Sequence, residues 1–333
     1  MKFLKFSFIR VGICAFALAV VVNAAFYWPG LWYGAFGWGN TWHHEPGDFA
    51  VHYVDVAHGA CTIFQFPDGK TAIIDIGEDT YFPRVDKYIK ERIKPHKNRF
   101  DYVIETHPDA DHNGGFARFK KHYGVGEWFD MWNVEEGQVI NGPTYRIQFH
   151  AVATQSQRDN FASLSAQGRN DLSPIITVEY FAKQKHVFVI PGDAGRTTQA
   201  DFEASPAVNE ILGDAREENT VVYVQVPHHG LGKLLGDDWN PVNYNWYDFL
   251  GASYAIIPVG TRWSPGDIYT VLDFFGVEYY LTRDMGNIVT VVNKGAVTWY
   301  FGFDNVPNLV ALWWLVGLLV TILCFIKYTK IVV

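Results

Sequence analysis

Most of the chain is built from short apolar runs separated by polar segments, a pattern typical of strands that alternate with turns and helices. Runs of strand length recur from about residue 48 to residue 300, and several are bounded by Gly, Pro or Asp. The predicted strands are AVHYVDV (50–56), TIFQF (62–66), TAIIDIG (71–77), DYVIE (101–105), YRIQFHAV (145–152), PIITVEYF (174–181), HVFVIPG (186–192), VVYVQVP (221–227), YAIIPVG (254–260), EYYLT (278–282) and IVTVVN (288–293).

Helical periodicity interrupts this pattern. Residues 84–93 space Val85, Tyr88, Ile89 and Ile93 along one apolar face, and further helices are predicted over residues 116–123 and 267–275. Strands interleaved with helices over about 250 residues predict one layered α/β domain with mixed sheets. The longest polar stretch, residues 154–171, is predicted to be a loop bordering a site.

Two long apolar segments flank this domain. Neither 11–42 nor 306–326 contains a charged residue or a histidine, and each is close to the roughly 20 residues that a membrane-spanning helix needs. We therefore predict transmembrane helices over 11–33 and 306–326. The alternative for the first is a cleaved signal peptide, since Val22-Asn23-Ala24 resembles a cleavage site. A retained anchor is favoured because apolar character continues past Ala24.

Basic residues at the outer ends of both segments predict the membrane orientation. Residues 1–10 and 327–333 would be cytoplasmic tails under the positive-inside rule. The domain over 48–302 would then face the extracytoplasmic or periplasmic side of the cell's inner membrane. The lipid bilayer that holds the two helices is the first expected partner of the protein.

The charge and cysteine content exclude some classes of site. Between the apolar segments lie all 35 acidic residues but only 22 Lys and Arg, a balance of −13 with histidine neutral. A broad non-specific nucleic-acid surface would be basic. Cys14 and Cys324 fall in the apolar segments, which leaves Cys61 alone in the domain, without a disulfide partner or a cysteine zinc motif.

The densest group of chemical side chains follows the strand DYVIE. In ETHPDADHNGG, two imidazoles and two carboxylates have the spacing H-x-D-x-D-H: His107, Asp109, Asp111 and His112. Clustered carboxylates repel one another unless a positive charge lies between them. On a tight loop these side chains could point at two neighbouring cations.

Other strands end in similar side chains. Asp193 follows HVFVIPG, as a carboxylate bridging two metals would need, and the pair His228 and His229 follows VVYVQVP. Asp75 in TAIIDIG could orient a ligand histidine. An Asp after a strand is usually a turn former, but four such endings in one chain together indicate a metal centre.

These motifs resemble those of metallo-β-lactamase-fold hydrolases, whose usual pattern is H-x-H-x-D-H. The resemblance is closest to the extracytoplasmic domain of ComEC-type competence proteins, which have Asp at the second position, as Asp109 is here. It extends through VHYVDVAHGACTIF, GKTAIIDIG, THPDADHNGG, VIPGDAG, VPHHG and IIPVGTRWSP to TRDMGNIVTV. The implied fold is a four-layer αββα sandwich with a two-metal site.

The resemblance also implies roles for individual residues. His107 and Asp109 would bind one metal, Asp111 and His112 the second, and Asp193 both. One histidine of the 228–229 pair would complete the set, with His229 favoured as the ligand and His228 facing the substrate. His150 lies in the right interval for a further ligand, although a strand or surface histidine explains it equally well. Zinc is the expected metal and manganese the alternative, because Asp in place of His hardens the site.

Some positions depart from the related pattern. The relatives' D-V-G-Q-G-D appears here as Asp55-Val56-Ala57-His58-Gly59-Ala60, so its second acid is missing, and His58 is expected to support the ligands as Asp75 does. The histidine expected before Pro265 is Ser264. The multi-span channel of competence proteins is absent, since the sequence has room for two helices, so the protein could work beside a separate membrane protein.

The expected function is a membrane-anchored, metal-dependent hydrolase. Asp193 would hold both ions, and either a metal-bound carboxylate such as Asp111 or His228 would handle the proton. By resemblance the leading activity is that of a phosphodiesterase or nuclease on DNA, in uptake or processing. Basic residues that could guide DNA, or simply form solvated helix faces, are Arg84, Lys87, Lys90, Arg92, Lys94, Lys97, Arg99, Arg118, Lys120 and Lys121.

Two alternatives stay open. The first is hydrolysis of a small phosphoester, a head group or a lactone, which suits the acidic balance and the aromatic loops around Trp128, Trp132, Trp239 and Trp246. The second is a non-catalytic membrane scaffold, which would have no use for a full set of metal ligands. No oligomeric state is predicted.

Overall fold

The computed structural model describes residues 43–213, 219–231, 244–262 and 264–302. These fall into two compact units, of which the larger comprises residues 43–283 and 288–299. The smaller includes residues 284–287 and 300–302, where the Gly302 N–H donates to the Met285 carbonyl at 2.6 Å. The predicted membrane segments 11–33 and 306–326 and the tails 1–10 and 327–333 lie outside the described residues. Within the described ranges, no helix combines the length and apolar character that crossing a bilayer requires.

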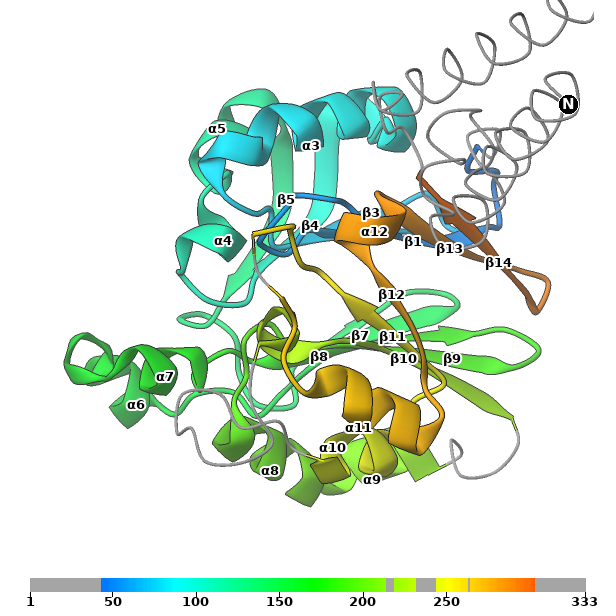
Figure 1. The fold of residues 1–333 in the computed structure, drawn as a ribbon. Coiled ribbons are helices and arrows are strands. Elements are labelled where there is room, and N and C mark those ends of the chain that lie inside the picture. Colours follow the sequence, from blue (N-terminus) through cyan, green and yellow to red (C-terminus); the bar gives the residue numbers. More distant parts are fainter. Residues whose placement is uncertain (1–42, 214–218, 232–243, 263, 303–333) are drawn as a thin grey trace, which may run out of the picture. The chain divides into compact units, whose positions relative to one another are not determined.

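Two seven-stranded mixed sheets form the centre of the larger unit (Figure 1). The first sheet has the order β14-β13-β1-β2-β3-β4-β5 and the second the order β12-β11-β10-β9-β8-β7-β6. The strands are β1 (Phe49–Tyr53), β2 (Thr62–Gln65), β3 (Thr71–Ile74), β4 (Arg99–Glu105), β5 (Gly124–Asp130), β6 (Val139–Asn141), β7 (Tyr145–His150), β8 (Ile175–Phe181), β9 (Lys185–Ile190), β10 (Thr220–Gln225), β11 (Tyr254–Ile257), β12 (Glu278–Leu281), β13 (Ile288–Asn293) and β14 (Ala296–Phe301).

Helices cover the outer face of each sheet (Figure 1). The α-helices are α3 (Phe82–Tyr88), α4 (Ala110–Asn113), α5 (Phe116–His122), α6 (Gln155–Asp159), α7 (Ala166–Asn170), α8 (Arg196–Ala204), α9 (Pro206–Gly213), α10 (Tyr244–Leu250), α11 (Ile268–Phe275) and α12 (Thr282–Met285). A π-helical turn, η2 (Ile89–Ile93), continues α3, and 3-10 turns occupy η1 (Asp79–Tyr81), η3 (His96–Asn98), η4 (Phe161–Ser163) and η6 (Pro227–Gly230).

Aromatic side chains fill the space between the sheets. Phe49 of β1 stacks on Tyr180 of β8 with ring centroids 4.5 Å apart, and it meets Phe188 of β9 at 5.4 Å. Phe66 stacks on Tyr145 at 3.8 Å. These rings are buried, and such contacts join the inner faces of two sheets into one core.

A second core lies beneath the helices of the other layer. Phe202 of α8, Val208 of α9, Trp246 of α10 and Val271 of α11 pack with the strands β9, β10 and β11, and all four are fully buried. The layers are therefore helix, sheet, sheet, helix, which confirms the four-layer αββα arrangement that the resemblance implies.

Strand direction determines where functional side chains gather. β3, β4 and β5 are parallel in the first sheet, and β9, β10, β11 and β12 are parallel in the second. The carboxyl ends of parallel neighbours lie at one edge, where α/β sheets commonly present ligand-binding loops. The polar strand endings noted in the sequence are on these strands.

Candidate metal centre

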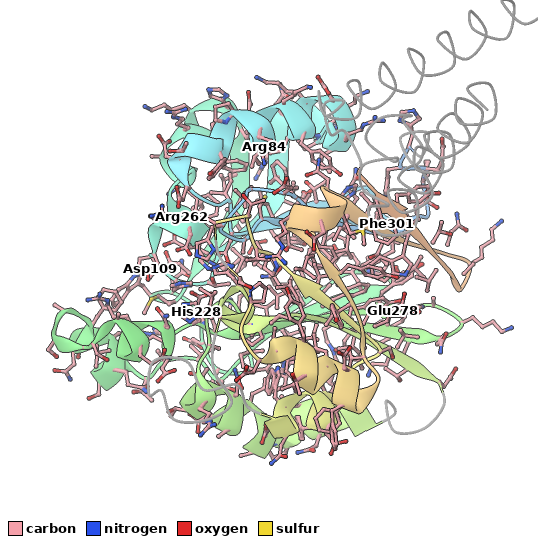
Figure 2. The ribbon with its side chains drawn as sticks, viewed as in Figure 1. Arg84, Asp109, His228, Arg262, Glu278 and Phe301 are labelled. Carbon is pink, nitrogen blue, oxygen red and sulfur yellow. The ribbon has the colours of Figure 1, made fainter. Side chains whose placement is uncertain are left out.

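The loops after β3, β4, β9 and β10 meet at this edge. His112, from the β4 loop, approaches Asp193 from the β9 loop with its Nε2 3.0 Å from Oδ1. His229, from the β10 loop, lies with its Nε2 3.2 Å from that of His112. Figure 2 labels Asp109 and His228 on two of these loops. Residues separated by more than a hundred positions in the sequence are thus brought within hydrogen-bonding distance.

A short helix, rather than the expected tight loop, carries part of the motif. His107 lies two residues after the end of β4, and Asp109 is the N-cap residue of α4, so Asp111 and His112 lie on the helix itself. The chain packs closely here: a Cβ added at Gly59 would lie 2.4 Å from the Asp111 carbonyl oxygen, which accepts from the Ala60 N–H at 3.0 Å. Gly59 is therefore required where the β1 loop meets the motif.

The paired histidines occupy a strained turn. His228 and His229 have φ of 47° and 56°, in the left-handed region that residues other than glycine seldom adopt. A hydrogen bond from the His228 N–H to the Gly192 carbonyl at 3.2 Å holds the turn against the β9 loop. Strain of this kind is kept where the surrounding structure imposes it, commonly at functional sites.

One group of four side chains has the arrangement of a metal site. The potential ligand atoms of Asp111, His112, Asp193 and His229 all lie within 4.8 Å of one another, and three of the four residues are buried. Asp111 Oδ2 lies 3.1 Å from His229 Nε2. Two imidazoles and two carboxylates at this separation form a donor set suited to a divalent cation such as zinc or manganese.

When the rings of these histidines are neutral, the hydrogen bonds around them leave their metal-binding atoms without protons. His229 Nδ1 donates to the Pro258 carbonyl at 2.8 Å, so in the neutral ring Nε2 carries a lone pair. That lone pair faces the Asp111 carboxylate. His112 Nδ1 is likewise engaged by the Asp75 carboxylate at 2.7 Å, so when this ring is neutral two acceptor nitrogens face one another. A cation between these acceptors resolves the conflict, which shows that the residues fit a metal.

A second group forms around the other oxygen of Asp193. Oδ2 lies 3.5 Å from His107 Nε2 and 3.6 Å from His228 Nε2. His107 is 0% exposed, and its Nε2 has no hydrogen-bond partner. A buried polar atom without a partner is costly, and a metal ligand is a common explanation. The geometry thus groups His228 with His107, whereas the sequence favoured a position facing the substrate.

The electrostatics of the cluster follow from this arrangement. Burial alone would raise the pKa of Asp193, but the histidines around it hold that pKa well below its usual value. Burial would also raise the pKa of Asp111, and the His229 contact together with the charge of His112 lowers it instead. Both carboxylates are therefore ionised near neutral pH and available as ligands.

A buried network holds the motif from behind. Asp75 accepts from the Thr106 N–H at 2.8 Å and from the Thr106 hydroxyl at 2.7 Å, while it also binds His112. Thr106 Oγ1 lies 3.1 Å from His107 Nδ1. The predicted orienting role of Asp75 matches this geometry. Thr106 was missed by the sequence reasoning, although its position between the strand and His107 was the available signal.

The remaining predicted residues lie in different places. The side chain of Asp109 is half-buried and makes no capping hydrogen bond at the start of α4. His58 lies beside the cluster, with Nε2 3.6 Å from Asp111 Oδ2 and its ring centroid 4.5 Å from that of His229. His150 is buried in β7, where it bonds to Thr177 at 2.9 Å and packs edge-on against Phe202. The structure does not bring His150 together with the four-residue cluster.

Comparison with known proteins agrees with this fold. The family model of the metallo-beta-lactamase superfamily matches residues 54–129, which include β2 to β4, most of β5 and the H-x-D-x-D-H motif. No curated protein matches the chain.

Solved structures match the chain at low sequence identity and with TM-scores between 0.32 and 0.39. A HARLDQ-motif metallo-beta-lactamase from Cronobacter sakazakii is 15% identical, with 54% of this chain and 87% of that chain covered and a TM-score of 0.32. A diphosphatase from the PhnP family is 10% identical, with 69% of this chain and 83% of that chain covered and a TM-score of 0.39. A long form of RNase Z from yeast is 11% identical, with 62% of this chain and 36% of that chain covered and a TM-score of 0.35. None of these likenesses assigns a substrate to this chain.

Proposed function

We propose that this protein is a two-metal hydrolase that cleaves phosphoesters. The observation that carries the proposal is the position of Asp193, whose two oxygens face separate groups of histidines: Oδ1 faces His112 and Oδ2 faces His107. A buried carboxylate shared in this way is what a site for two neighbouring cations requires.

The side chains would divide between the two ions as follows. Asp111, His112 and His229 would hold one ion, His107 and His228 the other, and Asp193 both. Ions bound there would supply positive charge to a phosphoryl group and make a water molecule more acidic. Asp109 is a further candidate ligand on the His107 side, in accordance with the family resemblance.

The protein's own side chains would manage proton transfer. Burial, with the neighbouring His229, lowers the pKa of His58 to about 4, so its ring is neutral near pH 7. Its Nε2 lies 3.6 Å from Asp111 Oδ2, so His58 is one candidate to exchange a proton beside the cluster, although a lowered pKa makes the ring a weak base. His228, half-buried, is the other candidate that the geometry allows.

DNA is the leading substrate by resemblance to competence proteins, and a small phosphoester is the second candidate. The ion pairs that basic residues form with neighbouring carboxylates favour the small phosphoester. Arg84 pairs with Asp55 at 3.2 Å, Lys90 with Asp86 at 2.7 Å, and Arg118 with Asp79 at 2.8 Å. Basic side chains already paired with carboxylates attract an anionic strand less strongly.

A direct assay distinguishes these substrates. The full chain, purified in detergent and loaded with zinc or manganese, is given linear DNA and bis(4-nitrophenyl) phosphate in parallel. Cleavage of DNA supports the nuclease, and turnover of the small ester alone supports the second candidate. Absence of turnover together with absence of bound metal would contradict the proposal and favour a scaffold.

We further propose membrane anchoring through residues 11–33 and 306–326, with the domain outside the cytoplasm. A reporter fused after Val333 is expected to be active only on the cytoplasmic side. Activity on the opposite side would contradict this orientation.

A further inference from the structure

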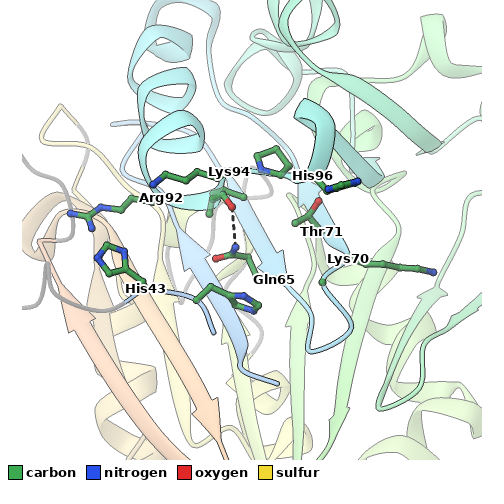
Figure 3. Close-up of a pocket in the computed structure, with 11 residues that line it drawn as sticks. His43, Gln65, Lys70, Thr71, Arg92, Lys94 and His96 are labelled. Atoms are coloured by element: carbon green, nitrogen blue, oxygen red, sulfur yellow. Dashed lines mark hydrogen bonds between the residues drawn. The ribbon is translucent and has the colours of Figure 1, made fainter. Parts of the chain in front are cut away.

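A cavity of about 460 Å³ lies at the opposite end of β3 from the metal centre. Thr71, which lines it, begins β3, whereas Asp75 of the metal centre follows the last residue of the same strand. The rest of the lining comes from Gln65 at the end of β2, from Gly69 and Lys70 before β3, from residues 92–96, and from His43 and His44 (Figure 3). The cavity is therefore separate from the proposed catalytic site.

The lining of this cavity is basic. It includes Arg92, Lys94 and three histidines, and none of its eleven residues is acidic. Figure 3 shows His43, Arg92, Lys94 and His96 along one rim. Lys70 also belongs to the lining, but its ammonium donates to the Tyr102 hydroxyl at 2.9 Å. A concave site with this charge attracts anions and excludes free cations.

A buried hydroxyl gives the cavity a specific donor. Thr71 is 4% exposed, and its Oγ1 has no hydrogen-bond partner, although its backbone N–H donates to Asp101 at 2.9 Å. A buried polar atom without a partner calls for an explanation, and a ligand oxygen would supply one. At the end of the helix that borders this cavity, the Ile93 carbonyl already accepts a hydrogen bond from Gln65 Nε2 at 3.2 Å.

The structure also divides the basic run noted in the sequence. Lys87 and Lys90 pair with acids one helical turn away, at 3.9 Å and 2.7 Å, as residues of a solvated helix face do. Arg92 and Lys94, at the end of the same helix, line the cavity.

We propose that this cavity binds the phosphate group of a small phosphate ester, with Arg92 and Lys94 pairing with its charge and Thr71 donating to one of its oxygens. The volume lies in the range of small-molecule sites, so it accommodates an ester or head group rather than phosphate alone. A lipid head group and a soluble ester share this chemistry. His43 follows the predicted membrane segment by about ten residues, which span at most roughly 35 Å, so a head group is within reach.

Binding is tested on the full chain after treatment with chelator, which removes the metal centre as a competing phosphate site. Isothermal titration calorimetry compares glycerol 1-phosphate, glycerophosphoglycerol and inorganic phosphate, with chloride as the reference anion. The Arg92→Gln/Lys94→Gln double variant is expected to bind about tenfold more weakly or worse. The matched control is Lys90→Gln, which lies outside the lining and should bind as the wild type does.

Thr71→Val is the second variant, and it keeps the test decisive if the double variant fails to fold. It removes a hydroxyl that has no partner in the protein, so the melting temperature should not fall while affinity does. Preference for glycerophosphoglycerol would indicate a lipid source, and preference for glycerol 1-phosphate a soluble one. Equal affinity in all variants, or binding no stronger than that of chloride, would overturn the proposal. Because no metal is present, this result is independent of the hydrolase assay.

Discussion

The carboxylate of Asp75 lies 2.7 Å from Nδ1 of His112, and both side chains are buried. Asp75 is also held in place, because it accepts two hydrogen bonds from Thr106. Since a carboxylate can only accept, the contact puts the proton of the neutral His112 ring on Nδ1 and leaves Nε2 free to bind a cation. Asp75 would thus set the tautomer of a proposed ligand without itself contacting the metal.

Replacing Asp75 with Asn should weaken metal binding, because an amide can donate to Nδ1 and favour the wrong tautomer. The expected loss is about 10- to 100-fold in affinity, measured by competition with a chromogenic chelator. Asp248→Asn, at an exposed position on α10, is the control and should bind metal normally. Unchanged affinity in the Asp75 variant would remove the proposed role of this contact.

The two histidines of the β10 loop should serve different ions. His229→Ala removes a ligand beside His112, and His228→Ala removes one beside His107, so each variant is expected to lose one of two ions. Metal content of the purified variants by elemental mass spectrometry measures this. If His228→Ala retained both ions, His228 would instead face the substrate, as the sequence favoured.

Asp111→Ala should remove activity while preserving the fold. The side chain is 21% exposed and contacts His229 at 3.1 Å, so its removal affects the cluster more than the core. Turnover is expected to fall by about two orders of magnitude or more. The melting temperature of the metal-free variant should match that of the metal-free wild type. Full turnover would refute the assignment of this site.

Acid should destabilise the fold through a histidine away from the metal centre. His52 is buried between Tyr88 and Gln65, and burial lowers its pKa from 6.5 to about 3. Below about pH 6.5, His52 therefore binds a proton in the unfolded chain but stays neutral in the folded chain. Stability is retained above that pH and lost as the pH falls toward 3, by roughly 1 to 2 kcal/mol at about pH 5.

His52→Phe removes this titration and should flatten the dependence of melting temperature on pH between about pH 7 and 5. The variant is expected to be less stable near pH 7, because Tyr88 and Gln65 lose a partner. His96→Gln, at an exposed position, should leave the slope unchanged. An equal slope in the His52 variant would show that other groups cause the acid sensitivity.

Strand alternation and motif spacing predicted much of the fold. The β-branched and aromatic runs became β1 to β4 and β7 to β13, and helix α11 begins after Asp267 as expected. The strand β5, GVGEWFD, was missed because its two glycines resemble a turn. Residues 154–171, predicted as a loop, contain α6 and α7, each begun by a side-chain cap from Thr154 or Ser165.

The candidate site was predictable only in part. The H-x-D-x-D-H motif and the strand-end residues carry chemistry that is visible in the sequence. Which histidines share an oxygen of Asp193 depends on how two sheets pack, and no local pattern encodes that. For the same reason the basic cavity was not predicted, since it joins His43, Thr71 and Lys94 from separate segments. His150 lay in a plausible interval, but in the structure its partners are Thr177 and Phe202.

Asp193 is proposed to join two metal ions in one centre. The most direct measurement is the number of zinc or manganese ions bound per chain, by elemental mass spectrometry after dialysis, in the wild type and in Asp193→Ala. Two ions in the wild type and fewer than one in the variant are predicted. A wild type that binds no metal, or an Asp193→Ala variant that retains two ions, would contradict the account.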